Sequence, residues 1–325
     1  MVYSSCQLKL GQALWDPKLK NLYLTHITFI GGGTMACAIL DGLAESMSTT
    51  LKPGQAPEHT FSITTRRQER TMQLSERYPR AYVTDSNDDG RLWELARNDE
   101  STAHIVLICT KPQSTLEVCQ SIRLAHKSIP AAYNLPIVVT MCPGITIAQL
   151  ESWLNPHSHS NRFPVVRTMP NTPVSIRQGA TALVPSRWAS ASEVDCVVTF
   201  FRVFSPCVEV LPKETLLDVA AAVSGSGPAW IFQYYKSLIE AAVQWGLPED
   251  LARSLIMQTG IGASMLANEQ PEISLSSMIS DVCVPGGSTE KGIKRLVDLG
   301  LQEAVADAVG TSLGANHRMG GHPSL

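Results

Sequence analysis

Short apolar runs alternate with segments of helical spacing over the first two thirds of the chain. The runs cover residues 24–30, 61–64, 104–109, 137–140 and 165–167, and the stretch from Thr34 to about Met47 is the first helical segment between them. Apolar strands separated by amphipathic helices are typical of a parallel sheet with both faces covered. The pattern therefore predicts an α/β domain with a Rossmann-type parallel sheet.

The strand pattern stops after about residue 212, and only helical segments follow. They cover residues 214–223, 227–245, 249–267, 275–281, 288–299 and 301–313. Residues 227–267 are apolar around most of the helical circumference, more than one small domain can bury. We therefore expect an N-terminal extension over 1–22, a dinucleotide domain over 23–212 and an all-helical dimerisation and substrate domain over 213–325. The expected partner is a second copy, as a homodimer or a larger assembly of dimers.

Composition excludes several classes of partner. The formal net charge of −3, with acidic and basic residues mixed, argues against nucleic acid or an anionic membrane as an obligate partner. The eight cysteines form no C-x-x-C pair and are expected to be reduced thiols. His157 and His159 lie in a polar loop without further ligands nearby, so no metal site is expected. Without a secretory signal or an apolar run of membrane-spanning length, we expect a cytoplasmic protein.

A glycine-rich turn follows the first strand. Dinucleotide folds need a glycine for the tight turn, a second for close approach of the pyrophosphate, and a small residue where helix meets strand. Gly31, Gly33 and Ala36 fill these places, and the helix that begins near Thr34 offers free N–H groups to phosphates. The alternative is a glycine turn in an unrelated α/β fold.

The end of the second strand indicates which cofactor binds. NAD enzymes place an acidic residue there, whereas this chain has Thr65, Arg66 and Arg67, with no carboxylate before Glu69. A hydroxyl and a guanidinium suit a 2′-phosphate, which favours NADPH. The alternative is that both arginines are solvent-facing charges at the start of a helix.

Further polar residues follow the later strands. Lys111 comes after the buried run 104–109, and ligands of open α/β sheets lie beyond the carboxyl ends of the strands. Met141 and Asn171 follow the next two runs, at the edge where a nicotinamide ring would lie. Lys111 could equally be a loop lysine, and Asn171 could close a turn instead of binding a carboxamide.

A Pro-Gly-Gly turn precedes the helical segment 288–299. Such a turn exposes the first N–H groups of the helix, and these can bind a carboxylate. The alternative is N-capping by Ser288 or Thr289.

Together these motifs resemble the pyrroline-5-carboxylate reductase family from about Thr28 to Val309. The resemblance rests on the glycine turn, the segments 111–113 and 169–173, and above all on Val-Ser-Gly-Ser-Gly-Pro-Ala (223–229), Gly-Leu-Pro (246–248) and Pro-Gly-Gly-Ser-Thr (285–289). It implies an NADPH-dependent reduction of 1-pyrroline-5-carboxylate to proline, with Thr289 bonded to the ring nitrogen. The implied cofactor residues are Ile30, Gly31, Gly32, Gly33, Thr34, Met35, Thr65, Arg66, Asn87, Cys109, Thr110, Lys111, Pro112, Met141, Cys142 and Pro143, with Asn171 beside them, and the implied substrate residues are Asp281, Gly287, Ser288 and Thr289.

The chain departs from the family pattern at Val284, at Asp281, at Cys142-Pro143-Gly144 and by about three extra residues between Glu269 and Ser280. The changes near the substrate turn leave the exact imine open, and a methyl-substituted pyrroline would fit a more apolar pocket. Two other functions stay open at this point. One is a β-hydroxyacid-type dehydrogenase, for which Lys236 is the only candidate general acid on the long helix, and the other is a non-catalytic NADP(H)-binding regulator.

Overall fold

The computed structural model describes residues 25–50, 61–94, 103–127, 135–156 and 162–319. The expected N-terminal extension, the Pro53–Pro57 loop and the two loop histidines, His157 and His159, lie outside the described residues. The chain divides into two compact units. The first comprises residues 1–225 and 313–325, and the second comprises 226–312. The domain boundary near residue 212 stays a prediction.

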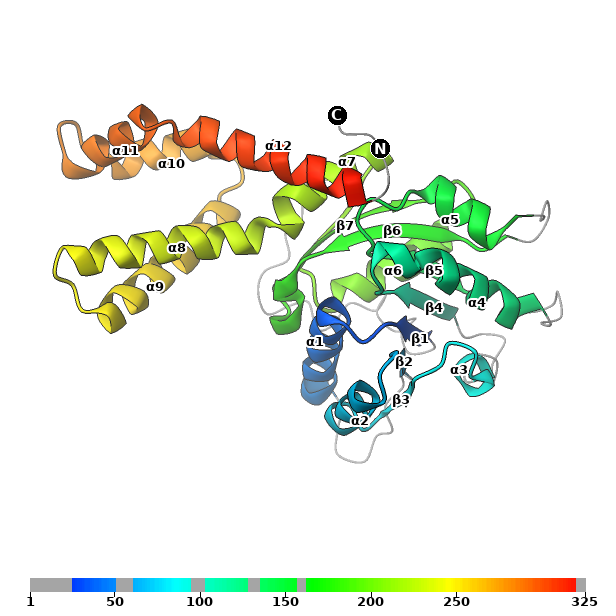
Figure 1. The fold of residues 1–325 in the computed structure, drawn as a ribbon. Coiled ribbons are helices and arrows are strands. Elements are labelled where there is room, and N and C mark those ends of the chain that lie inside the picture. Colours follow the sequence, from blue (N-terminus) through cyan, green and yellow to red (C-terminus); the bar gives the residue numbers. More distant parts are fainter. Residues whose placement is uncertain (1–24, 51–60, 95–102, 128–134, 157–161, 320–325) are drawn as a thin grey trace. The chain divides into compact units, whose positions relative to one another are not determined.

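The first unit contains an eight-stranded sheet in the order β3-β2-β1-β4-β5-β6-β7-β8 (Figure 1). All neighbours are parallel except β6 and β7. The order from β3 to β6 is that of a doubly wound dinucleotide fold, with the switch point between β1 and β4. The expected Rossmann-type domain is confirmed. The strands are β1 Thr25–Ile30, β2 Phe61–Thr64, β3 Ala81–Thr84, β4 Ala103–Ile108, β5 Ile137–Thr140, β6 Val165–Pro170, β7 Ala180–Pro185 and β8 Cys207–Val210.

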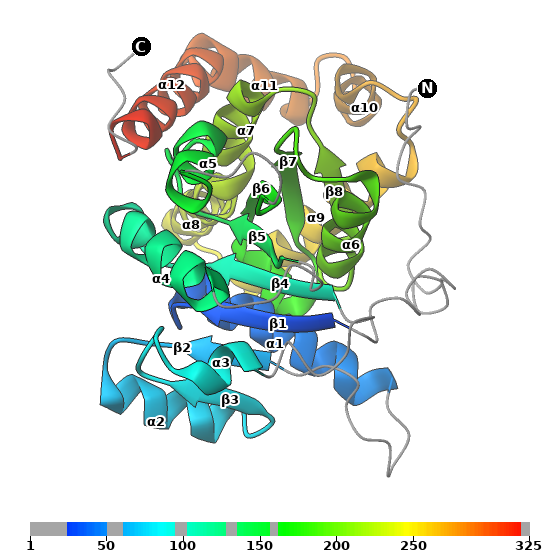
Figure 2. The same cartoon turned by 90° about the vertical axis from the view of Figure 1, so that its right-hand side faces the viewer.

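Helices cover both faces of this sheet. One apolar core lies between the sheet and α1, α2 and α6, and another lies between the sheet and α3, α4 and α5. Figure 2 shows α4 and α5 on one side of the strands and α6 on the other. The helices are α1 Thr34–Thr50, α2 Gln68–Arg77, α3 Gly90–Glu94, α4 Thr115–Lys127, α5 Ile147–Leu154 and α6 Ala191–Arg202, with short 3₁₀ turns η3 Pro112–Ser114 and η4 Thr172–Ile176.

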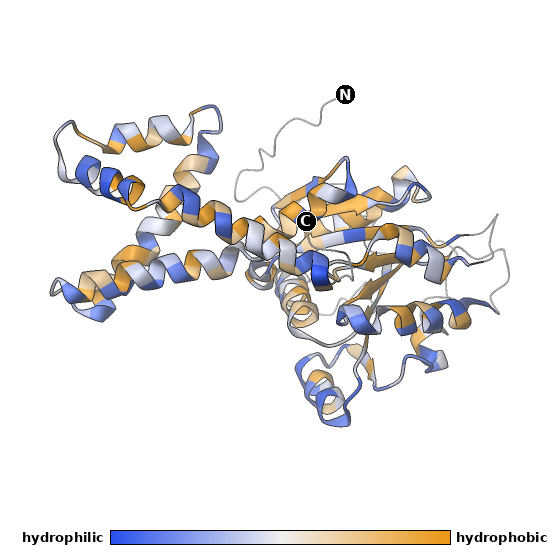
Figure 3. Cartoon of the chain, turned by 45° about the horizontal axis from the view of Figure 1, so that its top comes forward, coloured by the Kyte–Doolittle hydropathy of each residue, from blue (hydrophilic) through white to orange (hydrophobic). Residues whose placement is uncertain are grey.

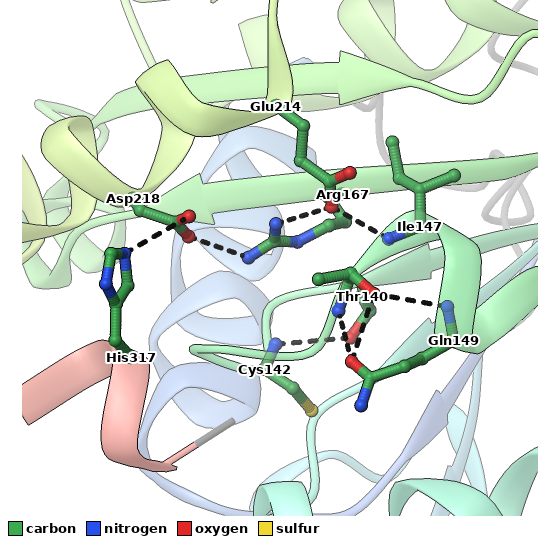
Figure 4. Close-up of polar contacts among 9 residues, drawn as sticks. Thr140, Cys142, Ile147, Gln149, Arg167, Glu214, Asp218 and His317 are labelled. Carbon is green, nitrogen blue, oxygen red and sulfur yellow. Dashed lines mark hydrogen bonds and ion pairs between the residues drawn. The ribbon is translucent and has the colours of Figure 1, made fainter. Parts of the chain in front are cut away.

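A buried arginine joins the sheet to the next helix, α7 (Glu214–Ala220). Arg167 of β6 is 2% exposed, and its guanidinium donates to Glu214 Oε1 at 2.6 Å and to Asp218 Oδ1 at 3.1 Å. The second carboxylate also faces His317 Nε2 at 3.7 Å (Figure 4). A charge can stay in this interior because both carboxylates pair with it.

The expected helix over 214–223 is wrong in one respect. The α-helix ends at Ala220, and residues Ala221–Gly225 form a π-helical turn, η5. π-Turns are rare and are enriched at functional sites. This turn ends where the second unit begins.

The second unit is helical and exposes much apolar surface. Gly246, at φ +94°, ends α8, where Leu247 N–H bonds to Ala242 O and Gly246 N–H to Val243 O, as in a Schellman motif. Of residues 226–312 only Ala252 is buried, while Trp245 is 90% exposed. Figure 3 shows apolar residues recurring along these helices. They are α8 Gly227–Gln244, α9 Glu249–Glu269, α10 Leu275–Val282, α11 Ser288–Asp298 and α12 Leu301–Met319, whose last residues belong to the first unit.

None of the described helices combines the length and low charge that crossing a bilayer requires. Among the same residues, His, Cys, Asp and Glu side chains form no group of three or more suited to a metal ion.

Candidate active site

The strand register places the expected cofactor residues along one edge of the sheet. The last residues of five neighbouring strands pair with one another and form a line across the sheet. They are Thr84 of β3, Thr64 of β2, Ile30 of β1, Ile108 of β4 and Thr140 of β5. Each of the four segments that begin at Gly31, Thr65, Cys109 and Met141 starts one residue beyond this line, and Asn87 lies three residues beyond it. Carboxyl ends beside the switch point are where open α/β sheets bind their ligands.

The glycine turn is shaped for close approach. Gly31 has φ +106°, which side-chain-bearing residues rarely adopt, and a Cβ there would lie 3.0 Å from the Cys109 carbonyl oxygen. A Cβ on Gly32 would overlap the Leu74 side chain, whereas one on Gly33 would meet nothing nearer than 3.9 Å. Packing explains the first two glycines but not the third. Open space at Gly33, at the start of α1, is what a bound pyrophosphate needs.

A buried hydroxyl without a partner lies beside this turn. Thr110 Oγ1 is shielded from solvent and has no hydrogen-bond partner in the described part of the chain. The methyl group of the same side chain would contact a Cβ on Gly31 at 3.1 Å. Buried hydroxyls are normally satisfied, so an unpaired one at a ligand-binding edge fits a polar ligand there. The residues present therefore fit a dinucleotide.

The loop after β2 presents a hydroxyl and a fixed guanidinium. Thr65 is buried, and its hydroxyl accepts the Arg67 N–H at 3.2 Å. Arg66 is exposed, but its Nη2 donates to Ser114 Oγ at 2.5 Å. That contact crosses from the β2 end to the β4 end, so Arg66 is held over the expected adenosine side. Arg66 and Arg67 are both exposed, Arg67 at the N-cap of α2, so the alternative of solvent-facing charges stays open and the 2′-phosphate role of Arg66 stays a prediction.

A buried thiol joins the two loops on the expected nicotinamide side. Cys142 Sγ lies 3.2 Å from the Thr110 carbonyl oxygen and 3.4 Å from Thr115 Oγ1. Burial raises the pKa of the neighbouring Cys109 thiol well above its usual range, so that sulfur stays protonated. These cysteines therefore act as packing and weak hydrogen-bonding groups.

Asn171 is engaged within the protein. Its Oδ1 accepts the Ala180 N–H at 2.9 Å, and its Nδ2 donates to the Ser224 carbonyl at 3.4 Å. These contacts match the alternative in which Asn171 closes local structure, here joining β6 to β7 and to the π-turn. Its role as a cofactor ligand stays a prediction.

Lys111 and Asn87 lie in loops at the same edge. Lys111 is exposed at the start of η3, and its carbonyl accepts the Ser114 N–H at 3.0 Å. The backbone carbonyl oxygen of Asn87 accepts the Trp93 Nε1–H at 2.9 Å. Both side chains stay available to a ligand, and their cofactor roles remain predictions.

The Pro-Gly-Gly turn of the second unit leaves two hydroxyls unused. The N-cap of α11 is Gly287, without a side-chain cap, so the alternative in which Ser288 or Thr289 caps the helix does not hold. Gly287 N–H bonds to Val284 O and Gly286 N–H to Glu290 Oε2, both at 2.8 Å. Within residues 226–312 the Ser288 and Thr289 hydroxyls have no partner, and Asp281 is exposed on α10. Glu290 partly offsets the positive end of the helix, while the Ser288 and Thr289 groups face solvent.

The comparisons match both halves of the chain. A family model described as "Pyrroline-5-carboxylate reductase dimerisation" matches residues 214–319, and one described as "NADP oxidoreductase coenzyme F420-dependent" matches residues 26–130. A Delta-1-pyrroline-5-carboxylate reductase of Gibberella fujikuroi is 43% identical over 300 residues, which cover 91% of this chain and 97% of the relative. The pyrroline-5-carboxylate reductase of Corynebacterium melassecola is 30% identical over 92% of this chain and 100% of its own length. The chain belongs to the pyrroline-5-carboxylate reductase family.

A solved structure agrees with this family assignment. The pyrroline-5-carboxylate reductase of Coxiella burnetii superposes with a TM-score of 0.71 at 30% identity, covering 90% of this chain and 97% of that chain. The resemblance drawn from the sequence motifs is thereby confirmed. The rival dehydrogenase loses its support with this assignment, and its candidate acid, Lys236 of α8, pairs with Glu240 at 2.9 Å.

Two residues at the cofactor edge of this reductase were not expected from the sequence. Ser114 holds Arg66, and Arg70 of α2 donates to the glycine turn. Arg70 does carry a sequence signal, because it is a cation in the first turn of a helix, where the helix dipole disfavours positive charge. Ser114 carries none, since its partner comes from another strand end.

Proposed function

We propose that this chain reduces 1-pyrroline-5-carboxylate to proline with NADPH, as a homodimer. The observation that supports this most is the likeness to enzymes of that name over nearly the whole chain, through both units. The glycine cradle and the unpaired Thr110 hydroxyl supply a site for the dinucleotide. When bound, NADPH supplies a hydride at C4 of its nicotinamide.

At the cofactor edge, backbone groups at the start of α1 and the loop that follows β2 do the binding. N–H groups at the start of α1 face the diphosphate, with Gly33 leaving room for it. Thr65 and Arg66 meet the 2′-phosphate, since a guanidinium offers a dianion two parallel hydrogen bonds. This assignment predicts a preference for NADPH over NADH.

At the substrate turn, the first N–H groups and hydroxyls of α11 supply the donors. The N–H groups of Ser288 and Thr289 clamp the substrate carboxylate, and the Thr289 hydroxyl bonds to the ring nitrogen and orients the imine. With NADPH bound, hydride would add to the carbon of the protonated imine, and the electron pair of the C=N π bond would pass to the nitrogen and give the amine. No protein acid is required if the imine arrives protonated, so positioning carries the catalysis.

Val284, just before this turn, and Asp281, at the end of α10, are exposed residues that bear on which imine is preferred. Val284 adds apolar surface immediately before the Pro-Gly-Gly turn. A methyl-substituted pyrroline carboxylate is therefore the natural second substrate to try, because an added methyl buried there contributes about 1 kcal/mol.

The deciding assay follows NADPH consumption with 1-pyrroline-5-carboxylate and, in parallel, NADP⁺ reduction with a 3-hydroxy acid. Imine-dependent oxidation of NADPH, faster than that of NADH, with no reaction on the hydroxy acid, is the expected result. Turnover of the hydroxy acid alone would restore the dehydrogenase. Tight NADPH binding without turnover of either substrate would favour a regulatory protein.

A further inference from the structure

Arg70 grips the glycine-rich turn from the neighbouring helix. Its Nε and Nη2 both donate to the Gly32 carbonyl oxygen, each at 3.2 Å. Nη2 also lies 3.1 Å from Cys37 Sγ, and Nη1 donates to Gln73 Oε1 at 3.1 Å. Four contacts fix one half-buried guanidinium. The contact joins α2, which follows β2, to the turn that follows β1.

The place of Arg70 on its helix is unfavourable for a cation. Arg67 is the N-cap of α2, so Arg70 occupies the third helical position, in the turn that carries the positive end of the dipole. The ordinary residue there is acidic, as Glu69 is one position earlier. The two hydrogen bonds from its guanidinium to the Gly32 carbonyl oxygen offset this unfavourable position.

The orientation of the Gly32 carbonyl determines the orientation of the next N–H. In a trans peptide the C=O of one residue and the N–H of the next point in opposite directions. Holding the Gly32 oxygen toward Arg70 therefore turns the Gly33 N–H away from α2. Glycine on both sides of this peptide bond makes a flipped orientation accessible, and Gly33 has no side-chain contacts to prevent it.

We propose that Arg70 is a positioning residue of the cofactor site, which holds the Gly32–Gly33 peptide so that the Gly33 N–H faces the diphosphate. This rests on the proposed dinucleotide site. Arg70 is then not a ligand of the 2′-phosphate, although it lies only four residues from Arg66. The two arginines act on different parts of the cofactor, Arg66 on the group that NADH lacks and Arg70 on the group that both cofactors share.

Binding measurements without substrate separate these roles. The dissociation constants of NADPH and NADH are measured by fluorescence titration for the wild type, Arg70→Met and the matched variant Arg66→Met. We expect Arg70→Met to weaken the binding of both cofactors by the same factor, about tenfold. That factor corresponds to the loss of one charge-assisted hydrogen bond, the one from the Gly33 N–H to the diphosphate. Arg66→Met should weaken NADPH alone. Arg70→Lys, which can donate one bond to the Gly32 oxygen, should recover part of the loss.

Three results would overturn the proposal. Selective weakening of NADPH by Arg70→Met would make Arg70 a 2′-phosphate ligand. Unchanged affinities with a lower melting temperature would make its role purely structural. If the methionine variant does not fold, wild-type affinities in Arg70→Ala, which likewise removes both donors to the Gly32 oxygen, lead to the same conclusion. If the wild type binds neither nucleotide, the proposed function itself fails. That result differs from one in which the wild type binds both nucleotides and the Arg70 variants bind them equally well, which overturns only the role of Arg70.

Discussion

Leu255 on α9 tests whether the helical unit is completed by a second copy. It is 61% exposed in the single chain, and its unit buries only Ala252. Burying a whole leucine side chain stabilises by about 2.5 kcal/mol, so the exposed part of Leu255 has about 1.5 kcal/mol still to gain. A two-fold interface counts each residue twice, which makes about 3 kcal/mol per dimer.

Leu255→Glu removes that gain and adds an unpaired charge in each protomer. Desolvating each carboxylate costs at least about 1 kcal/mol, so the dimer should lose about 5 kcal/mol. The dimer dissociation constant should rise by about three to four orders of magnitude, since each 1.4 kcal/mol is tenfold. Sedimentation velocity over a concentration series measures this shift, with monomer or aggregate replacing dimer.

The chain offers a closely matched control. Leu124, on α4 of the first unit, is 60% exposed, and Leu124→Glu makes the same chemical change at equal exposure. It should leave the association unchanged. Equal behaviour of the two variants, or a wild type that sediments as a monomer at every concentration, would refute the reasoning.

Three other residues test the substrate turn and the interior of the first unit. Thr289→Val keeps the side-chain shape and should lower kcat/KM for the imine at least about tenfold, because misplacement by about 1 Å can cost a hundredfold; titration should find NADPH affinity unchanged, and normal turnover would exclude Thr289 as a ligand. Burial lowers the pKa of His26 from its usual 6.5 to about 4, so the unfolded chain takes up the proton first and stability is full above pH 6.5 and lost as pH falls toward 4. The loss amounts to about 3 kcal/mol for this group, so His26→Asn should flatten urea-unfolding free energies across that pH window. Arg167→Met leaves the carboxylates of Glu214 and Asp218 without their guanidinium partner and should lower the free energy of unfolding by about 3–5 kcal/mol in the same assay at neutral pH. An unchanged free energy of unfolding would contradict this role of the ion pairs.

The central strands could be predicted from the sequence, because burial on both faces leaves an uninterrupted apolar run. β4 and β5 are of this kind, and their expected positions agree with the structure. β3 and β8 were missed because both are short and partly exposed, so only weak apolar patterns mark them. β7 was missed as well, and it pairs antiparallel to β6, which a strand-helix-strand pattern does not suggest.

The candidate site divides in the same way between local and long-range information. Gly31 and Thr65 were expected because the strand end and the residue type lie together in the sequence. Ser114 and Arg70 depend on which strand ends become neighbours, which the strand order decides. In the π-turn at Ala221–Gly225, Ser224 and Gly225 indicate that the helix weakens there, but residue type alone does not distinguish a π-turn from an ordinary helix end.

The Pro-Gly-Gly turn shows why a correct motif still left its chemistry open. From the sequence, a hydroxyl at residues 288 and 289 serves equally as a cap or as a ligand, because both roles place it at the start of α11. The backbone excludes the capping role. Gly287 takes the cap position with extended geometry, at φ −72° and ψ 174°, and Ser288 and Thr289 become the first two helical residues. Their hydroxyls then have no partner among residues 226–312, which is the observation behind the substrate role proposed for them.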